Sequence, residues 1–284
     1  MPIHAPTFPF SETPSLAAWT AYFCHAVQNA DLPVLAETSE ALEALRLDED
    51  RVDANLLGEV ISADPLMTLK VQAYAASHRS KRLLTDTETV TAALVMMGIS
   101  PFFREFGLQP TVEAHLVDQP DALCGLQAVI TRAHRAATFA LSFAVHRMDH
   151  DAPVIHQAAL LHDFADMLMW CHAPILARQM RLAQLADTTL RSSALQEQVL
   201  GVKLPELQHA LMLVWRLPDL LVRCADASHA EHPSVKSVAL ATRLARHTAH
   251  GWDNAAVPDD VSDIALLLNK SSAATLDWLR EVDG

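Results

Sequence analysis

The apolar run that begins at Ala158 ends in an adjacent histidine and aspartate, His162 and Asp163. An imidazole nitrogen and a carboxylate oxygen are both good ligands for divalent transition-metal ions. A water bound to such an ion becomes a nucleophile near neutral pH. The pair is therefore a standard start for a binuclear metal site, which needs further ligands from other parts of the chain. With those ligands the protein would be a metal-dependent phosphohydrolase; without them the same scaffold must have another role.

The composition of the 284-residue chain favours an all-α protein with a substantial core. Hydrophobic residues make up 51% of the chain, Ala and Leu dominate, and there are only seven Gly and two Tyr. Helix formers therefore outnumber the β-branched and aromatic residues that strands prefer.

The charge balance argues against nucleic acid or an anionic membrane as a partner. The net charge is −13 and the pI is near 5.5, so the chain as a whole repels phosphate groups. The densest basic segments, residues 78–82 and 243–247, are short, and we interpret them as solvated helix ends. Without a signal peptide at residues 1–10 or an apolar run of about eighteen residues, we expect a soluble, cytoplasmic protein.

The sequence lacks several motifs that would indicate particular chemistry. It has no G-x-S-x-G elbow, Walker A loop or dinucleotide glycine fingerprint. The cysteines are far apart, whereas zinc-ribbon and redox motifs need close pairs. We interpret all four as buried free thiols in a reducing cytoplasm: Cys24, Cys124, Cys171 and Cys224.

Helical periodicity and helix caps recur along almost the whole chain. Residues 1–13, which are rich in proline, are expected to form an extended lead. Asp64-Pro65 supplies a cap and a first-turn proline for one helix, and Asp151 caps the helix expected to carry His162-Asp163. We expect about fifteen helices and no strand. The longer ones are expected near residues 14–29, 35–45, 52–63, 66–74, 90–97, 122–148, 178–187, 204–215, 217–230, 234–250, 257–269 and 271–282.

A resemblance to a known family rests on Asp64-Pro65-Leu66-Met67-Thr68-Leu69-Lys70, on Ser77, and on the helix that ends at Met97-Gly98. These segments look like the N-terminal half of the HDOD (HD-related output domain) family, a degenerate branch of the HD phosphohydrolase superfamily. That family typically has D-P-x-L-x-x-K, then Asn-Ser, then an I-x-x-A-I-x-x-L-G helix. Ala76 stands where the Asn is usual.

The resemblance covers about residues 30–250 and implies an all-α module of two packed helical lobes. We therefore divide the chain into an N-terminal extension with one helix (1–29), the module (30–250) and a C-terminal helical extension (251–284). The polar connection at residues 118–121 separates a first lobe from an HD-like second lobe. These lobes are expected at residues 30–117 and 122–250.

The resemblance also implies which positions would hold metal in the HD superfamily. His134 on the long helix matches the first histidine, His162 and Asp163 match the central pair, and His229 matches one of two later histidines. The register of the second half is set by Glu197, Gly201, Trp215 and Pro218. In that register the remaining ligand positions carry Leu204, Ser228 and Thr242, and Ala165 replaces a usual glycine.

Because Leu and Thr cannot replace an imidazole and a carboxylate, we expect no metal and no other cofactor. A mononuclear site at the residual positions His134, His162, Asp163 and His229 stays open as an alternative. If the pair is structural instead, Asp163 accepts a hydrogen bond from an N–H of His162, so that both polar groups have a partner. Other histidines are expected to be structural: His146, His150 and His156 near an exposed turn, His247 and His250 at a helix end, and His209 exposed on its helix.

The resemblance implies a bacterial signalling or regulatory component. Our first hypothesis is a non-enzymatic output or scaffold module that acts through protein–protein contacts, with binding of a nucleotide or other small ligand between the lobes left open. The second is a residual HD-type metal-dependent phosphohydrolase or phosphodiesterase. We expect a protein partner from a signalling pathway and neither nucleic acid nor membrane, and we leave a homodimer open.

Overall fold

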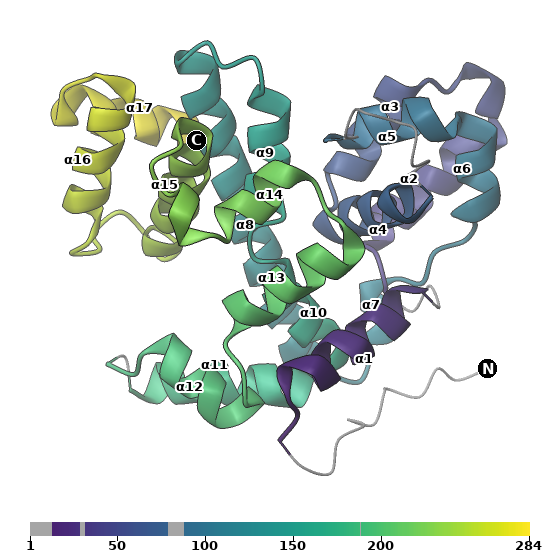
Figure 1. The fold of residues 1–284 in the computed structure, drawn as a ribbon, viewed down its shortest axis with the longest axis horizontal. Helices are drawn as coiled ribbons and strands as arrows, with labels where there is room; N and C mark the ends of the chain where they lie inside the picture. Colours follow the sequence, from purple (N-terminus) through teal and green to yellow (C-terminus); the bar gives the residue numbers. More distant parts are fainter. Residues whose placement is uncertain (1–12, 29–31, 79–87, 188) are drawn as a thin grey trace. The chain divides into compact units, whose positions relative to one another are not determined.

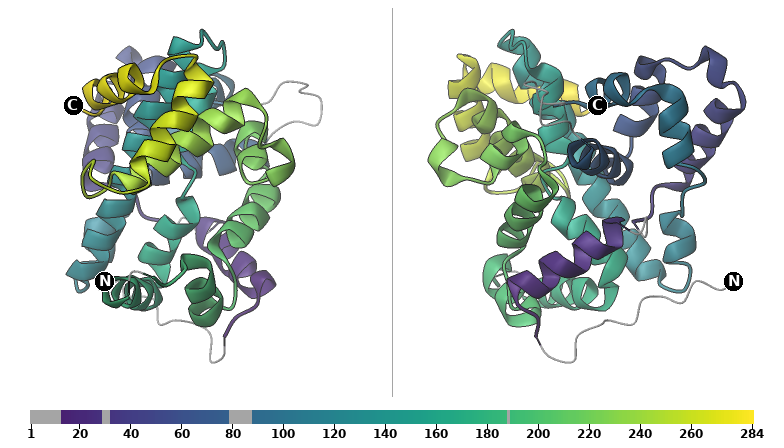
Figure 2. Two further views of the ribbon diagram at one scale, coloured as in Figure 1. Left: turned by 90° about the vertical axis from the view of Figure 1, so that its left-hand side faces the viewer. Right: turned by 45° about the vertical axis from the view of Figure 1, so that its right-hand side comes forward.

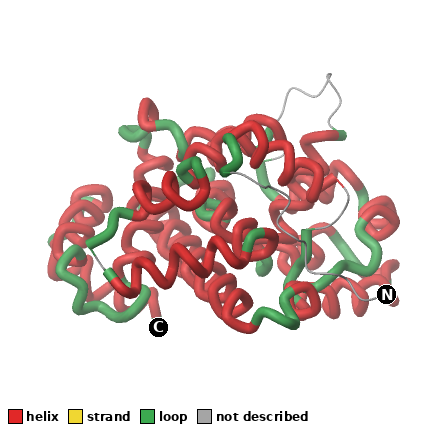
Figure 3. Tube along the Cα trace, turned by 90° about the horizontal axis from the view of Figure 1, so that it is seen from below, coloured by secondary structure: helices red, strands yellow, loops and turns green. Residues whose placement is uncertain are grey.

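The computed structural model describes residues 13–28, 32–78, 88–187 and 189–284, and this part of the chain is almost entirely helical (Figure 1). No strand is found in these residues (Figure 3), although Val34 and Thr111 form an isolated bridge. The all-α prediction is confirmed. The α-helices are α1 (Leu16–Gln28), α2 (Ala36–Leu47), α3 (Ala54–Ser62), α4 (Pro65–Ser77), α5 (Val90–Met97), α6 (Ile99–Glu105), α7 (Val112–His115), α8 (Pro120–His146), α9 (Ala152–Leu160), α10 (Phe164–His172), α11 (Pro174–Ala186), α12 (Ser192–Leu200), α13 (Leu204–Trp215), α14 (Asp219–Cys224), α15 (Pro233–His247), α16 (Val257–Leu268) and α17 (Ser272–Asp283), with short 3-10 helices at Glu49–Arg51 and Ala227–His229.

Several local predictions can be compared directly with these helices. Asp64 caps α4 as expected, whereas α9 ends at Leu160, so the helix predicted to carry His162-Asp163 stops before them. The helix predicted over 217–230 ends at Cys224. The proline-rich lead at residues 1–12 lies outside the described residues. Within those residues no helix, including the 27-residue α8, is both long and apolar enough to cross a bilayer.

The four cysteines are free thiols, but the prediction that all are buried is wrong. Only Cys171 is buried, because it lies on the inward face of α10; burial raises the pKa of its thiol. Cys124 is exposed near the start of α8, and Cys24 and Cys224 are partly exposed. Burial still raises the pKa of Cys224 to about 12.

The chain forms two compact units, and neither is continuous in sequence. The first takes the chain up to Val129 and then Phe164–Leu217; the second takes Ile130–Asp163 and Pro218–Gly284. This division differs from the sequential lobes expected from residues 118–121, because α8 contributes its first part to one unit and its last part to the other.

In the first unit, α2 to α6 enclose a hydrophobic core (these helices are labelled in Figure 1). Its fully buried members include Leu57 and Ile61 of α3, Leu94 of α5 and Phe102 of α6. The same unit holds α1, which packs on α13. The predicted inward residues Trp19 and Phe23 are fully buried there, and the Trp19 indole donates a hydrogen bond to the Leu200 carbonyl at 3.0 Å.

Asp64 and Lys70, the two polar ends of the D-P-x-L-x-x-K motif, make buried hydrogen bonds to other segments of the chain. One carboxylate oxygen of the fully buried Asp64 accepts the first amides of α4, from Leu66 at 2.8 Å and Met67 at 3.2 Å. The other oxygen accepts the Leu35 amide at 2.7 Å, at the start of α2. Further along α4, the buried Lys70 ammonium donates to the Leu32 carbonyl at 2.8 Å and to the side chain of Gln109. The motif therefore anchors two loops to α4.

In the second unit, α15 packs on α9, α14 and α16, and α17 packs on α16 (Figure 2). Asp260 of α16 is only 2% exposed and pairs with Arg243 and His247 of α15, each at 2.6 Å. His247 is thus part of a buried ion-pair network, and the prediction that it only decorates a helix end missed this. Near the chain end, Asp283 forms a two-pronged ion pair with Arg135 of α8, at 2.8 and 2.7 Å.

We predict that Asp64→Ala destabilises the protein by about 2–4 kcal/mol, because three buried amides lose their acceptor at once. Asp64→Asn should cost less, because its carbonyl oxygen can still accept the α4 amides. The measurement is the midpoint of denaturant unfolding. Exposed Asp53 caps α3 in a similar way, so Asp53→Ala serves as the matched control, expected to cost about 1 kcal/mol. Equal losses at both positions would contradict the role given to Asp64.

His172 on α10 generates a second prediction, on pH. Its ring is 3% exposed and packs against Tyr22 and Phe23 of α1, with His115 beside it. Burial lowers the pKa of His172 to about 3, with a further contribution from the nearby His115. Between about pH 6.5 and 3 the unfolded chain therefore binds a proton that the folded chain does not.

The free energy of unfolding should consequently fall as the pH drops through that window, with His172 contributing about 1.4 kcal/mol per pH unit. His172→Phe keeps an aromatic ring and should remove this contribution from the slope, measured by denaturant unfolding at a series of pH values. Exposed His232→Phe is the control and should leave the slope unchanged. An unchanged slope in His172→Phe would contradict the assignment.

Candidate functional site

His162 and Asp163 lie in the turn between α9 and α10, in the second unit. The apolar residues around them set this position, since Leu160, Leu161 and Phe164 are fully buried. The two polar side chains are left near the surface, 29% and 28% exposed. The pair is thus held by a buried turn and yet remains accessible to water.

Both carboxylate oxygens of Asp163 already have cationic or imidazole partners. Its Oδ1 lies 2.9 Å from the Nδ1 of His162. Its Oδ2 accepts two hydrogen bonds from the guanidinium of Arg132 on α8, from Nε at 3.3 Å and Nη2 at 3.2 Å. A small cluster of His162, Asp163 and Arg132 therefore replaces an isolated His-Asp pair; we call it the HD triad.

The HD triad favours the charged form of Asp163. Burial by itself would raise the pKa of this carboxyl group. The hydrogen bond and charge of His162, followed by the charge and hydrogen bonds of Arg132, outweigh burial and hold the pKa well below its usual range. Asp163 is thus a carboxylate at neutral pH whose negative charge is balanced from within the protein.

This arrangement opposes metal binding at Asp163. A divalent ion would have to approach an oxygen that already accepts two guanidinium hydrogen bonds, and the like charges of ion and arginine would repel each other. The guanidinium thus supplies positive charge to a carboxylate that would bind a metal ion in an HD-type centre.

The residual position His134 lies near a histidine that the sequence analysis placed at an exposed turn. His156 is instead on α9 and only partly exposed. Burial lowers the pKa of His156, and the charge of His134 lowers it further. Both the burial of His156 and the nearby His134 therefore disfavour the charged form of His156.

The other residual position, His229, is engaged within its own turn. It lies in the short 3-10 helix after α14, where its Nδ1 is 3.1 Å from the carboxylate of Asp226 and 3.1 Å from the hydroxyl of Ser228. Asp226 also accepts the Ser228 amide at 2.9 Å. Such local bonds compete with helical ones, which explains why α14 ends early.

The departures from the ligand pattern are also satisfied locally. Thr242 is buried on α15 and its hydroxyl donates to the Val238 carbonyl at 2.9 Å, and the Ser228 hydroxyl donates to Asp226 at 2.8 Å. Leu204 is the first residue of α13, in the first unit. In the part of the chain that the structure describes, no three His, Cys, Asp or Glu side chains are grouped so that they could hold a metal ion.

Arg132 is the site residue that sequence reasoning missed. It precedes His134 by two positions on α8. The HD-type ligand pattern indicates the histidine on this helix but not the arginine. A general rule could have indicated it, because a half-buried carboxylate without its metal needs another cation. The rule does not say which of the arginines on α8 supplies the charge.

Comparison with known families identifies the family of this chain. The HDOD domain profile matches residues 32–231, well over half of the chain. The chain belongs to the HDOD family. The match agrees with the resemblance found in the sequence and lies within the range of about 30–250 expected from it.

Solved structures share the fold of this HDOD protein. The MmoQ response regulator of Methylococcus capsulatus is 20% identical, with 84% of this chain and 97% of that chain covered at a TM-score of 0.62. A virulence factor of Campylobacter jejuni is 18% identical, with 91% and 98% covered at a TM-score of 0.59. At these identities the likeness concerns the fold alone. No curated protein matches significantly.

We predict that Arg132→Met lowers the free energy of unfolding of the HDOD protein by about 1–2 kcal/mol at neutral pH, because Asp163 keeps its charge but loses a cation. The folded pKa of Asp163 is depressed, so the stabilisation is present above its unfolded pKa of about 4 and is lost as the pH falls further. The difference between wild type and Arg132→Met should therefore shrink below about pH 4.

Denaturant unfolding at several pH values measures this difference. The control is Arg223→Met, which breaks an exposed ion pair with Asp219 in the same unit and should change stability little. A loss in Arg132→Met that stays constant down to about pH 2 would show that the arginine acts through packing and not through the charge of Asp163.

Proposed function

We propose that this HDOD protein is a non-catalytic signalling or regulatory module whose HD-type centre is closed by its own arginine. The observation that carries the proposal is the HD triad, in which both oxygens of Asp163 are used by Arg132 and His162. A water nucleophile in an HD-type hydrolase is generated by metal, and the triad offers a balanced carboxylate in place of a metal ligand.

The remaining ligand positions support the same function. Ser228 and Thr242 donate their hydroxyl hydrogens to neighbouring oxygens, and His229 is bonded within its turn. Without a reactive centre, the module acts through contacts of its surface with a protein of a signalling pathway. The description of MmoQ, which has the same fold, as a response regulator agrees with such a role.

Metal content and hydrolysis test the proposal together. Protein purified without chelator should contain metal well below one ion per chain, measured by mass spectrometry of Mn, Fe, Ni and Zn. Added Mn²⁺, Fe²⁺, Ni²⁺ or Zn²⁺ should not produce hydrolysis of cyclic dinucleotides or nucleoside monophosphates above the buffer rate. The physical reason is the guanidinium on Asp163, which repels a cation at that carboxylate.

Asp163→Ala is the decisive variant, with Asp226→Ala as the control because that carboxylate also contacts a histidine but is exposed. Neither variant should change metal content. Stoichiometric metal in the wild type that disappears in Asp163→Ala and persists in Asp226→Ala would establish a metal site and overturn the proposal. Metal-dependent hydrolysis with the same pattern would decide for the residual phosphohydrolase.

The surface role has its own test. Immobilised protein should retain the same protein from an extract of its native host whether or not Asp163 is replaced by Ala, because the partner is recognised by the surface and not by the centre. Retention that depends on Asp163, or that needs added divalent metal, would contradict this part of the proposal.

A further inference from the structure

One face of α11 is exposed in the part of the first unit that the structure describes. α10 and α12 pack against the other sides of this helix. The exposed face carries three large apolar side chains, Ile175, Leu182 and Leu185, which are 73%, 53% and 67% exposed. Their spacing places them along one side of the helix. Single exposed apolar side chains are common on monomer surfaces, but three in one row form a contiguous apolar patch, which is typical of an interaction site.

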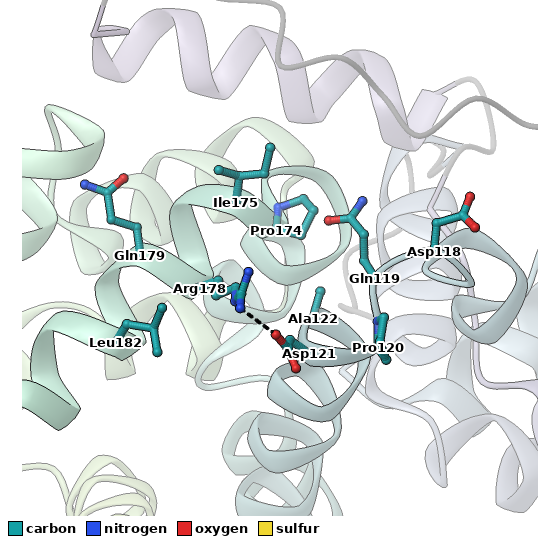
Figure 4. Close-up of a pocket in the computed structure, with 10 residues that line it drawn as sticks. All are labelled: Asp118, Gln119, Pro120, Asp121, Ala122, Pro174, Ile175, Arg178, Gln179 and Leu182. Carbon is teal, nitrogen blue, oxygen red and sulfur yellow. Dashed lines mark ion pairs between the residues drawn. The ribbon is translucent and has the colours of Figure 1, made fainter.

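A groove of about 420 Å³ lies beside the N-terminal half of this face (Figure 4). Its second wall is the segment Asp118–Ala122, which leads into α8. This wall is acidic, with Asp118 and Asp121. Arg178 of α11 forms an ion pair with Asp121 at 2.8 Å, and both side chains are more than half exposed. Exposed pairs of this kind exchange partners at little cost.

The C-terminal half of α11 continues this face beyond the groove, whose lining already includes Leu182 and Arg178. Leu182 and Leu185 form an apolar ridge, and the exposed Arg181 lies beside them. Although the whole chain has a net charge of −13, α11 contains two arginines and no acidic residue. An acidic groove at one end of the face is thus matched by a basic, apolar ridge at the other end.

Such a surface is complementary to a copy of itself that runs in the opposite direction. A two-fold axis across the middle of α11 would place Leu185 of each copy against the groove of the other, with the Leu182 side chains of both copies nearer the axis. It would also bring Arg181 of each copy towards Asp118 and Asp121 of the other. Antiparallel helices in addition oppose their dipoles favourably.

We propose that the exposed face of α11 and the Asp118–Ala122 groove form an isologous interface, and that its occupant is a second copy of this chain. The interface is built from one helix and one short segment per copy, so its area is at the low end of specific interfaces. The expected species is therefore a dimer in reversible equilibrium with monomer. This inference is independent of the state of the HD triad.

Sedimentation equilibrium over a range of protein concentrations tests the proposal. The wild type should show a monomer–dimer equilibrium, and Leu185→Glu should weaken dimerisation by about tenfold or more, because it places a carboxylate against the acidic wall of the other copy's groove. Leu47→Glu is the matched control, since Leu47 is 91% exposed at the end of α2, away from this face. It should leave the equilibrium unchanged.

A charge swap tests the orientation of the two copies. Asp118→Lys and Arg181→Glu should each weaken the dimer, because each places like charges opposite each other across the interface. The double variant should recover most of the affinity, since the lysine introduced in one copy then faces the glutamate introduced in the other. All these positions are exposed, so thermal unfolding should match the wild type. A wild type that is monomeric at every concentration, an equal loss in Leu47→Glu, or no recovery in the double variant would each overturn the proposal.

Discussion

A carboxylate can leave water only when its oxygens are hydrogen-bonded or its charge is paired, and both units of this protein depend on how that requirement is met. In the first unit, Asp64 is satisfied by three backbone amides that belong to two helices. In the second, Asp163, Asp260 and Asp283 are each paired with an arginine, from α8 or α15. The hydrogen bonds of Asp64 position the starts of α2 and α4, whereas the aspartate–arginine ion pairs connect residues that are far apart in the sequence.

The way in which Asp163 is satisfied also determines what the HD-type centre can do. A metal ion would need the carboxylate as a ligand and would balance its charge in return. Arg132 balances that charge without offering an open coordination position or a bound water. The scaffold therefore holds a His-Asp turn between two helices in which the carboxylate is paired with Arg132. Under the proposed function, this ion pair takes the place of metal chemistry.

The class and the family of this protein could be predicted from sequence because they depend on local and repeated signals. The abundance of Ala and Leu, the Asp64-Pro65 cap and Gly98 at the end of α5 act within one or two turns of a helix. The early end of α14 was missed, since Asp226 accepts a backbone amide there and competes with helix propagation. The end of α9 before His162 was also missed.

Arg132, the site residue that the sequence did not indicate, depends on a contact between residues that are far apart in the chain. Arg132 and Asp163 are 31 positions apart, and their contact exists only after α8 and α9 have packed. Neither helical periodicity nor a helix cap indicates such a contact. The same reason applies to Asp260 with His247 and to Asp283 with Arg135, since each pair joins two different helices. The exposed face of α11 could not be predicted either, because the sequence does not show which helices pack against α11.

The HD triad has a consequence for how this centre can change over generations. Loss of Arg132 alone would leave Asp163 with an unbalanced charge, and gain of an acidic or imidazole ligand at Thr242 or Ser228 alone would add a group with no ion to bind. Each single substitution is therefore unfavourable, and only their combination could restore a metal site. Under the proposed function, a metal site at this centre therefore needs several coordinated substitutions, because removing the arginine and adding a ligand are favourable only together.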